Sequence, residues 1–374
     1  MRFTTPEAGG RYWMLETIRE YAAERLEESG DSEQLRRRHA EWCLALAEEA
    51  VPHLRGGDPG EWLDRLGVEH DNLRAALDQF EALGETQCAL RLAGSLGNFW
   101  FVREHVVEGR LRLDRALAAD DRPTAARANA LNAASLLAQT GGDFAPGREL
   151  AAQALTIHRR LGNAQGVATS THLLGHAAVD LSEWATAQQL FDESLEAFRE
   201  LGDENAVLMT TDILAYTYYK LGDRARTLAL VENNLRLARA TQNRRMEATS
   251  LGALGLYAVE DGRLEDAVSP LEESTRIWRE VGAEFDEVGL NLCSFARVLA
   301  VAGRAAAATQ LISAAMSWHD EIGAVPRVFT ADLNEKTLAI IHGELDEAVF
   351  ADAWEQGARM TPDEAVEYAL ASID

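Results

Sequence analysis

Two histidines, His172 and His176, stand four residues apart near the middle of the sequence. If this segment is helical, both imidazoles lie on one face, where they could bind a metal ion or line a ligand site. No third metal ligand lies close to them in the sequence, so we expect a ligand-lining role and no bound metal. The alternative is that the pair sits incidentally on a solvated face.

Short motifs of common catalytic and nucleotide-binding sites are missing from the sequence. HExxH, GxSxG and GxGxxG do not occur, and neither lysine of the chain, Lys220 or Lys336, follows the glycine that a P-loop requires. An enzyme built on His172, His176 and Asp212 would lack a visible nucleophile–base pair. We therefore predict a protein that has no catalytic activity and needs no cofactor.

Polar residues and glycines recur at a spacing of about 40 residues. Asn132, His172 and Asp212 follow one another at intervals of 40. One glycine series comprises Gly162, Gly202, Gly282 and Gly323, with Gln242 in its remaining slot; a parallel series comprises Gly142, Gly222, Gly262 and Gly303, with Ser182 in one slot. Two such series held in phase indicate a tandem structural repeat.

This repeat predicts pairs of antiparallel helices. We align five units at 125–164, 165–204, 205–244, 245–284 and 285–324, with a shorter, diverged unit at about 86–121. Each unit has two small residues twelve positions apart, such as Gly175 and Ala187, which allow its two helices to cross closely. The recurring glycines would end helices in the left-handed conformation, so we interpret them as loop residues and not as phosphate ligands. We predict an all-α, right-handed solenoid, with sheet confined at most to residues 2–15.

Small residues twelve positions apart in a helix pair resemble the tetratricopeptide repeat, although the usual period of that repeat is about 34 residues. Four segments further resemble the sensor region of bacterial signal-transduction ATPases, the group that includes MalT and the large LuxR-type transcriptional regulators. They read RYWMLETIREYAAERL at 11–26, RRRHAEWCLALAEEA at 36–50, WLDRLGVEHDNLRAAL at 62–77 and FADAWEQGARMTPDEAVEYAL at 350–370. The resemblance covers essentially the whole chain.

The resemblance implies four parts of the chain. Residues 1–30 would be the wing, a short β-hairpin, and the last helix of a winged-helix module; 31–85 would be linking helices, 86–324 the repeat array and 325–374 capping helices. The ATPase domain of full-length relatives would precede residue 1, and no DNA-binding helix-turn-helix is evident after the array. The implied function is a non-catalytic sensor or scaffold that controls an ATPase switch in signal transduction or transcription. A free-standing protein–protein adaptor is the alternative.

Composition narrows the choice of partners. The net charge of −25 disfavours binding to duplex DNA or to acidic membranes. Three cysteines, far apart in sequence, suit a reducing compartment better than disulfides or zinc. The first residues lack the apolar core of a signal peptide, and no apolar run reaches the length of a membrane span. We expect a cytoplasmic protein whose partner presents a neutral or basic surface.

The candidate ligand site follows from the repeat alignment. In tetratricopeptide-like stacks the first helix of each unit lines the concave face, so positions around its small residue point into a groove. Polar and aromatic residues at these positions are Asn132, His172, His176, Asp212, Tyr216, Tyr219 and Arg297. Such a set offers hydrogen-bonding groups and aromatic surface together. It would bind a protein, a peptide or a small effector.

Overall fold

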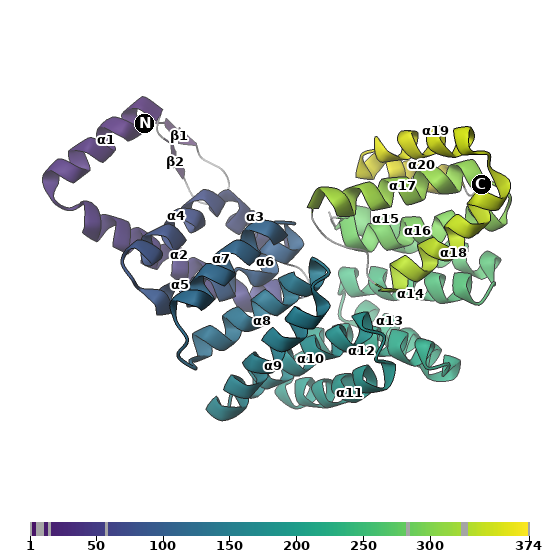
Figure 1. Cartoon of the computed structure of the whole chain (residues 1–374), viewed down its shortest axis with the longest axis horizontal. Helices are drawn as coiled ribbons and strands as arrows, with labels where there is room; N and C mark the ends of the chain where they lie inside the picture. The colour runs from purple at the N-terminus through teal and green to yellow at the C-terminus, as the bar shows by residue number, and fades with distance from the viewer. Residues whose placement is uncertain are drawn as a thin grey trace.

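The computed structural model describes residues 2–4, 11–13, 16–56, 59–281, 285–322 and 328–372. Twenty helices and two short strands lie in these ranges (Figure 1). The strands β1 (Arg2–Thr4) and β2 (Arg11–Trp13) pair antiparallel, with Phe3 opposite Tyr12. All other described elements are helices, so the predicted all-α solenoid is confirmed.

Seven helices precede the regular array. They are α1 (Glu16–Ser29), α2 (Ser32–Leu54), α3 (Gly60–Val68), α4 (His70–Ala82), α5 (Thr86–Ser95), α6 (Gly97–Val102) and α7 (Val106–Ala119). Helices α2 to α7 share an apolar core that contains the fully buried side chains of Phe80, Phe99 and Trp100. Gly94 and Gly97, near the break between α5 and α6, lie against the backbone and side chains of α8. The glycine-rich segment around them is therefore a packing contact.

Each of the five aligned units contains one helix pair. The pairs are α8 (Ala125–Thr140) with α9 (Phe144–Leu161), α10 (Ala164–Asp180) with α11 (Trp184–Leu201), α12 (Glu204–Lys220) with α13 (Arg224–Ala240), α14 (Arg244–Glu260) with α15 (Leu264–Glu280), and α16 (Phe285–Val301) with α17 (Ala305–Ile322). Three further helices follow: α18 (Val328–Glu344), α19 (Glu347–Ala358) and α20 (Pro362–Ala371). Leu333, Ile341 and Val366 of this last group join the core of α14 to α17, so these helices cover its apolar surface.

The small residues of each pair mark a close crossing. A Cβ atom added to Gly175 would lie 2.6 Å from Cε1 of Phe191, and one added to Gly255 would lie 2.5 Å from Cγ of Leu271. Because real Cβ contacts are longer, these positions accept only a very small residue. In these two units the crossing therefore depends on glycine in the first helix and a large apolar side chain in the second.

Positive φ angles occur at the repeated glycines, as the sequence predicts. Gly162 and Gly202 end α9 and α11 with φ of 66° and 69°, while Gly282 and Gly323 fall outside the described residues. Ser182 and Gln242 adopt the same left-handed conformation without being glycine, with φ of 60° and 55°. An L side chain is disfavoured there, because its Cβ approaches the following carbonyl oxygen.

Ion pairs connect consecutive units on the outer surface. Arg159 contacts Glu193 at 3.2 Å, Arg239 contacts Glu273 at 2.9 Å, and further pairs of this kind join Arg148 to Glu183 and Arg244 to Glu280. In three of these pairs the arginine reaches from one unit to the next, 34 or 35 residues along the chain, whereas Arg244 and Glu280 join α14 to α15 within one helix pair. Arginine suits this role because its planar guanidinium binds a carboxylate at well-defined angles.

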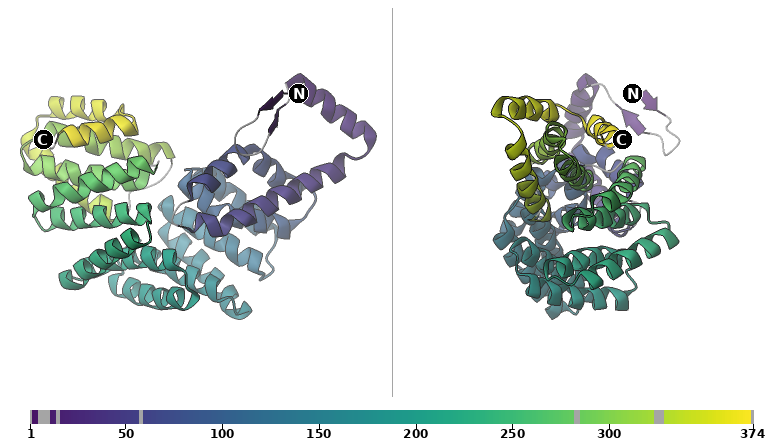
Figure 2. Two further views of the ribbon diagram at one scale, coloured as in Figure 1. Left: turned by 180° about the vertical axis from the view of Figure 1, so that it is seen from behind. Right: turned by 90° about the vertical axis from the view of Figure 1, so that its right-hand side faces the viewer.

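Viewed as a whole, the stack curves. Helices α2 to α7 and helices α14 to α20 lie on two sides of α8 to α13, and α1 extends away from the body (Figures 1 and 2). Across this curve, α18 contacts the repeat helices: Lys220 pairs with Asp332, and Nζ of Lys336 lies 2.5 Å from Oε2 of Glu260. The concave side is therefore bounded by both ends of the chain.

Replacing Gly175 with Leu should lower the free energy of unfolding by roughly 1–3 kcal/mol, because the new side chain overlaps Phe191. Chemical denaturation would measure the change. Gly343→Leu is the matched control, since Gly343 is an exposed position in α18 with no atom within 4 Å of an added Cβ. Equal stability of Gly175→Leu and the parent protein would contradict the close crossing.

Replacing Ser182 with Gly should stabilise the protein by about 1 kcal/mol, because the left-handed conformation costs a non-glycine residue that amount. The reciprocal change, Gly222→Ser, should destabilise it by a similar amount, since Gly222 is equally exposed and has a φ of 86°. The midpoints of thermal unfolding should move in opposite directions. Movement in the same direction would show that backbone strain does not decide the effect.

Candidate functional site

A cavity of about 350 Å³ lies on the concave side of the solenoid. Its main wall consists of the first helices α10, α12 and α14. Its opposite wall comes from the N-terminal part of the chain: Leu54, Gly56, Pro59, Phe101 and Val102. The cavity therefore joins residues that are more than 100 positions apart in sequence.

Four of the seven candidate residues line this cavity. His172 and His176 come from α10, and Asp212 and Tyr216 come from α12. These positions are 40 residues apart in two pairs, so consecutive units bring them together. Their role in ligand binding stays a prediction.

The other three candidates lie elsewhere. The side-chain oxygen of Asn132 is buried and accepts a hydrogen bond from Oγ of Ser170 at 2.8 Å, so it joins two helices of the array. Tyr219 stacks on Tyr257 at 4.8 Å, with Arg224 over its ring at 3.5 Å.

Arg297, the last of these three, donates to the main-chain oxygen of Lys336 at 3.0 Å. Arg297 therefore contacts α18 and does not line the cavity. The ladder of Asn132, His172 and Asp212 therefore does not form a continuous ligand surface.

The two histidines form a hydrogen-bonded pair at the side of the cavity. Their Nε2 atoms are 3.1 Å apart, and Nδ1 of His172 lies 3.0 Å from Oγ1 of Thr210. Phe191 packs against both rings in edge-on geometry, at 5.6 and 5.5 Å. Burial lowers the pKa of His172 to about 4, so its imidazole is neutral at pH 7.

Asp212 is the unusual side chain of the cavity. It is half-buried, and it forms neither a hydrogen bond nor an ion pair with any residue that the structure describes. Burial raises the pKa of its carboxyl group from 3.8 to about 7. The pKa of the Tyr257 phenol is raised as well. Burial is the main cause, and the negative charge of Asp212 is the second. A carboxylate held in this way is costly unless a ligand or a proton neutralises it.

Asparagines connect the N-terminal segment to the repeats at the edge of the cavity. Nδ2 of Asn205 donates to the main-chain oxygen of Arg55 at 2.5 Å, and Nδ2 of Asn243 donates to Oδ1 of Asn205 at 3.0 Å. Both asparagines line the cavity. Sequence reasoning missed them because they lie at the starts of α12 and α14, away from the positions around the small residue.

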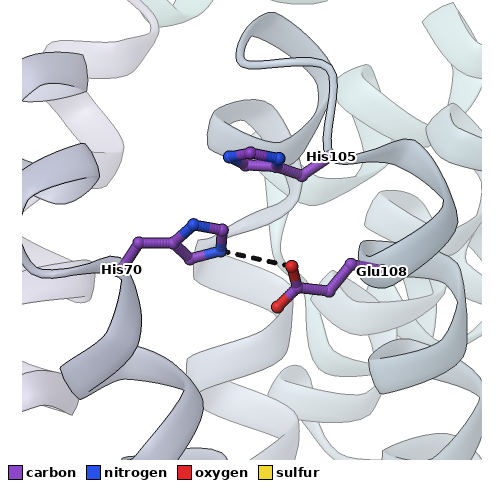
Figure 3. A group of neighbouring side chains, drawn as sticks. All are labelled: His70, His105 and Glu108. Carbon is purple, nitrogen blue, oxygen red and sulfur yellow. Dashed lines mark ion pairs between the residues drawn. The ribbon is translucent and has the colours of Figure 1, made fainter. Parts of the chain in front are cut away.

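A second cluster of possible metal ligands lies away from the cavity, between α4 and α7. Nε2 of His70 is 3.5 Å from Oε2 of Glu108, and the His105 ring stacks over His70 at 4.3 Å (Figure 3). Arg74 already binds both oxygens of Glu108, at 2.7 and 2.5 Å. We interpret the cluster as an ion pair that joins two helices, because the guanidinium neutralises the carboxylate that a metal would need.

Sequence comparison relates one stretch of the chain to proteins that are named as transcriptional regulators. No family model matches the chain. Three proteins that bear the provisional name HTH-type transcriptional regulator, one from Mycobacterium bovis and two from Mycobacterium tuberculosis, are 39 % identical over 99 residues. The match spans 26 % of this chain and only 11 % of the length of each relative.

Structural comparison relates the fold to helical repeat proteins. NprR in complex with its cognate peptide NprX matches with a TM-score of 0.53 and 14 % identity, over 80 % of this chain and 88 % of that one. A Rap protein complexed with Competence and Sporulation Factor matches with 0.51 and 10 %, over 84 % and 99 %. The apo form of RapI matches with 0.51 and 12 %, over 74 % and 95 %. At these identities the similarity establishes the fold.

Among the described helices, none has the length and apolar character of a membrane span.

Replacing Asp212 with Asn should raise the free energy of unfolding at pH 8 by roughly 1–3 kcal/mol. The folded-state pKa lies above the unfolded value, so this group favours folding at low pH and the contribution disappears as pH rises through about 7. The gain should therefore shrink towards pH 5, where the parent carboxyl is protonated. Denaturation curves at both pH values measure it.

Asp192→Asn is the control for this prediction, because Asp192 is exposed on α11 and the change removes the same charge. The control should show no such pH-dependent gain. If Asp212→Asn destabilises the protein at pH 8, the carboxylate has a partner in the folded chain and the description of the cavity is wrong.

Proposed function

We propose that this chain is the ligand-binding sensor region of a transcriptional regulator, and that the ligand occupies the concave cavity. The observation that carries the proposal is the cavity itself, with a half-buried carboxylate that no described residue pairs. A folded protein gains nothing from such a group unless the site serves a ligand. The chain would bind a ligand and transmit this binding to the rest of the regulator, and it would have no catalytic activity.

The comparisons support this proposal from two sides. NprR and Rap, whose helical repeats resemble this fold, have been crystallised with a cognate peptide and with Competence and Sporulation Factor. The mycobacterial relatives carry the name of transcriptional regulators. A short peptide or a small effector is therefore the ligand class that we favour. In longer relatives, residues 1–30 would be the end of a winged-helix module that follows an ATPase domain.

The position of the cavity suggests how binding would be transmitted. One wall belongs to the repeats and the other to the segment around Leu54 and Gly56, which lies between the N-terminal helices. A ligand that contacts both walls stabilises the arrangement in which they are close, because it binds that arrangement more tightly. Any domain attached before residue 1 would then experience a different orientation of α1 and α2. Ligand binding would control the switch through this difference.

Ligand binding should raise the melting temperature of the protein, because a ligand that binds only the folded state stabilises it. We would screen pools of short peptides and small metabolites by thermal shift and measure each hit by calorimetry. Met209→Trp should weaken binding by about tenfold or more, since Met209 is 49 % exposed and lines the cavity. Truncation of His172 and Tyr216 to Ala should weaken it too, with a loss of stability.

Asn233→Trp is the matched control for the cavity variant. Asn233 is exposed on α13, the second helix of the same unit, and does not line the cavity. Binding should survive this change. A ligand that binds the Met209→Trp protein as tightly as the parent, while Asn233→Trp abolishes binding, would move the site to the convex face and refute the proposal.

A further inference from the structure

The chemistry of the Asp212 environment restricts what can occupy the cavity. Tyr216 and Tyr257 present aromatic surface beside the carboxylate, and both are almost fully buried. Burial raises the pKa of the Tyr216 and Tyr257 phenols well above their usual value, so neither ring carries charge near pH 7. His172 is neutral as well. Tyr216, Tyr257 and His172 therefore give Asp212 neutral, aromatic neighbours.

The two cations nearest in the fold contact groups other than Asp212. Lys220, on the same helix as Asp212, pairs with Asp332 of α18 and lies 5.2 Å from the ring of Trp184. Arg245 lines the cavity, but its guanidinium lies over Trp278 at 5.4 Å. No described cation forms an ion pair with Asp212. The negative charge that appears when this carboxyl loses its proton therefore has no ion-pair partner among the described residues, although Arg245 shares the cavity.

We propose that the cavity selects ligands that carry a protonated amine or a guanidinium, and that the Asp212 carboxylate pairs with this group. The aromatic faces of Tyr216 and Tyr257 would hold the part of the ligand next to the cation, because aromatic rings attract cations as well as apolar surface. This inference rests on the proposed function, since it names the chemistry of the ligand in the same cavity. The net charge of −25 would also raise the local concentration of such cations.

The Asp212 carboxyl exchanges its proton near neutral pH, because burial raises its pKa to about 7. Titratable side chains that share the cavity with Asp212 are His172, His176 and Asp180 on α10, Tyr216 on α12, and Arg245 and Tyr257 on α14. Because the pKa of Asp212 is about 7, a cationic ligand must displace a proton near neutral pH. Affinity should then rise with pH up to about 8 and fall at lower pH, with proton release on binding.

Two pairs of probes test this inference. Phenethylamine and 2-phenylethanol differ only in whether an ammonium or a hydroxyl group ends the side chain. The tripeptide amide Phe-Gly-Gly with a free N-terminus and its N-acetylated form make the same comparison for a peptide. Saturation-transfer NMR at pH 8 would measure the four affinities for the parent, Asp212→Asn and the exposed control Asp192→Asn.

The cationic member of at least one pair should bind the parent and the Asp192→Asn control about tenfold more tightly or better than its neutral partner. Asp212→Asn should abolish this preference. Discrimination in the amine pair alone identifies a small-molecule site, and discrimination in the peptide pair identifies a peptide N-terminus. For the preferred probe, affinity should fall by about 30-fold between pH 8 and pH 5.5, from titration of a carboxyl group at about pH 7.

Equal binding within both pairs would overturn the inference, because the cavity would then bind ligands without regard to their charge; the proposed sensor function would stand. A preference that persists in Asp212→Asn would overturn it too and would direct attention to Asp180. If none of the probes binds the parent while hits from the thermal-shift screen bind and lack a cationic group, the inference also fails. Cationic hits that lose binding in Asp212→Asn would support it.

Discussion

The rest of the structure depends on the close crossing of two helices in each unit. Glycine in the first helix, as at Gly175 and Gly255, allows a large apolar side chain of the second helix to lie almost against the backbone. Repetition of this crossing places consecutive first helices side by side. Hydrogen bonds then form between residues one unit apart, such as Ser170 with Asn132 and Thr210 with His172. The cavity exists because α10, α12 and α14 are aligned in this way.

Curvature of the stack adds a second level of organisation. A straight array would leave its concave side open, whereas here α18 and the segment before α3 both reach across it. Leu333 and Ile341 anchor α18 in the apolar core. The contacts that each segment makes across the curve are polar: an amide to a main-chain oxygen on one side and lysine–carboxylate pairs on the other. Polar contacts of this kind exchange readily with water, so each contributes little to stability.

Sequence periodicity predicted the helices, their pairing and the glycine turns, because each of these depends on residues within one unit. It also placed His172, His176, Asp212 and Tyr216 on the cavity wall. It did not predict that Arg297 contacts α18, because nothing in one unit reveals the path of a helix that follows the array. The wall formed by Leu54, Gly56 and Val102 was equally invisible, because it depends on the accumulated curvature of several units. The missing counter-charge of Asp212 could be recognised only with all neighbouring side chains in place.

The arginine–carboxylate pairs between neighbouring units have a mechanical consequence. They lie on the outer surface, where consecutive units are held apart or drawn together as the stack bends. Dissolved salt screens such exposed pairs, with a Debye length of about 8 Å at physiological ionic strength. The attraction within each of these pairs along the array therefore weakens as ionic strength rises. Ionic strength therefore changes how strongly neighbouring units are held together on this surface of the array.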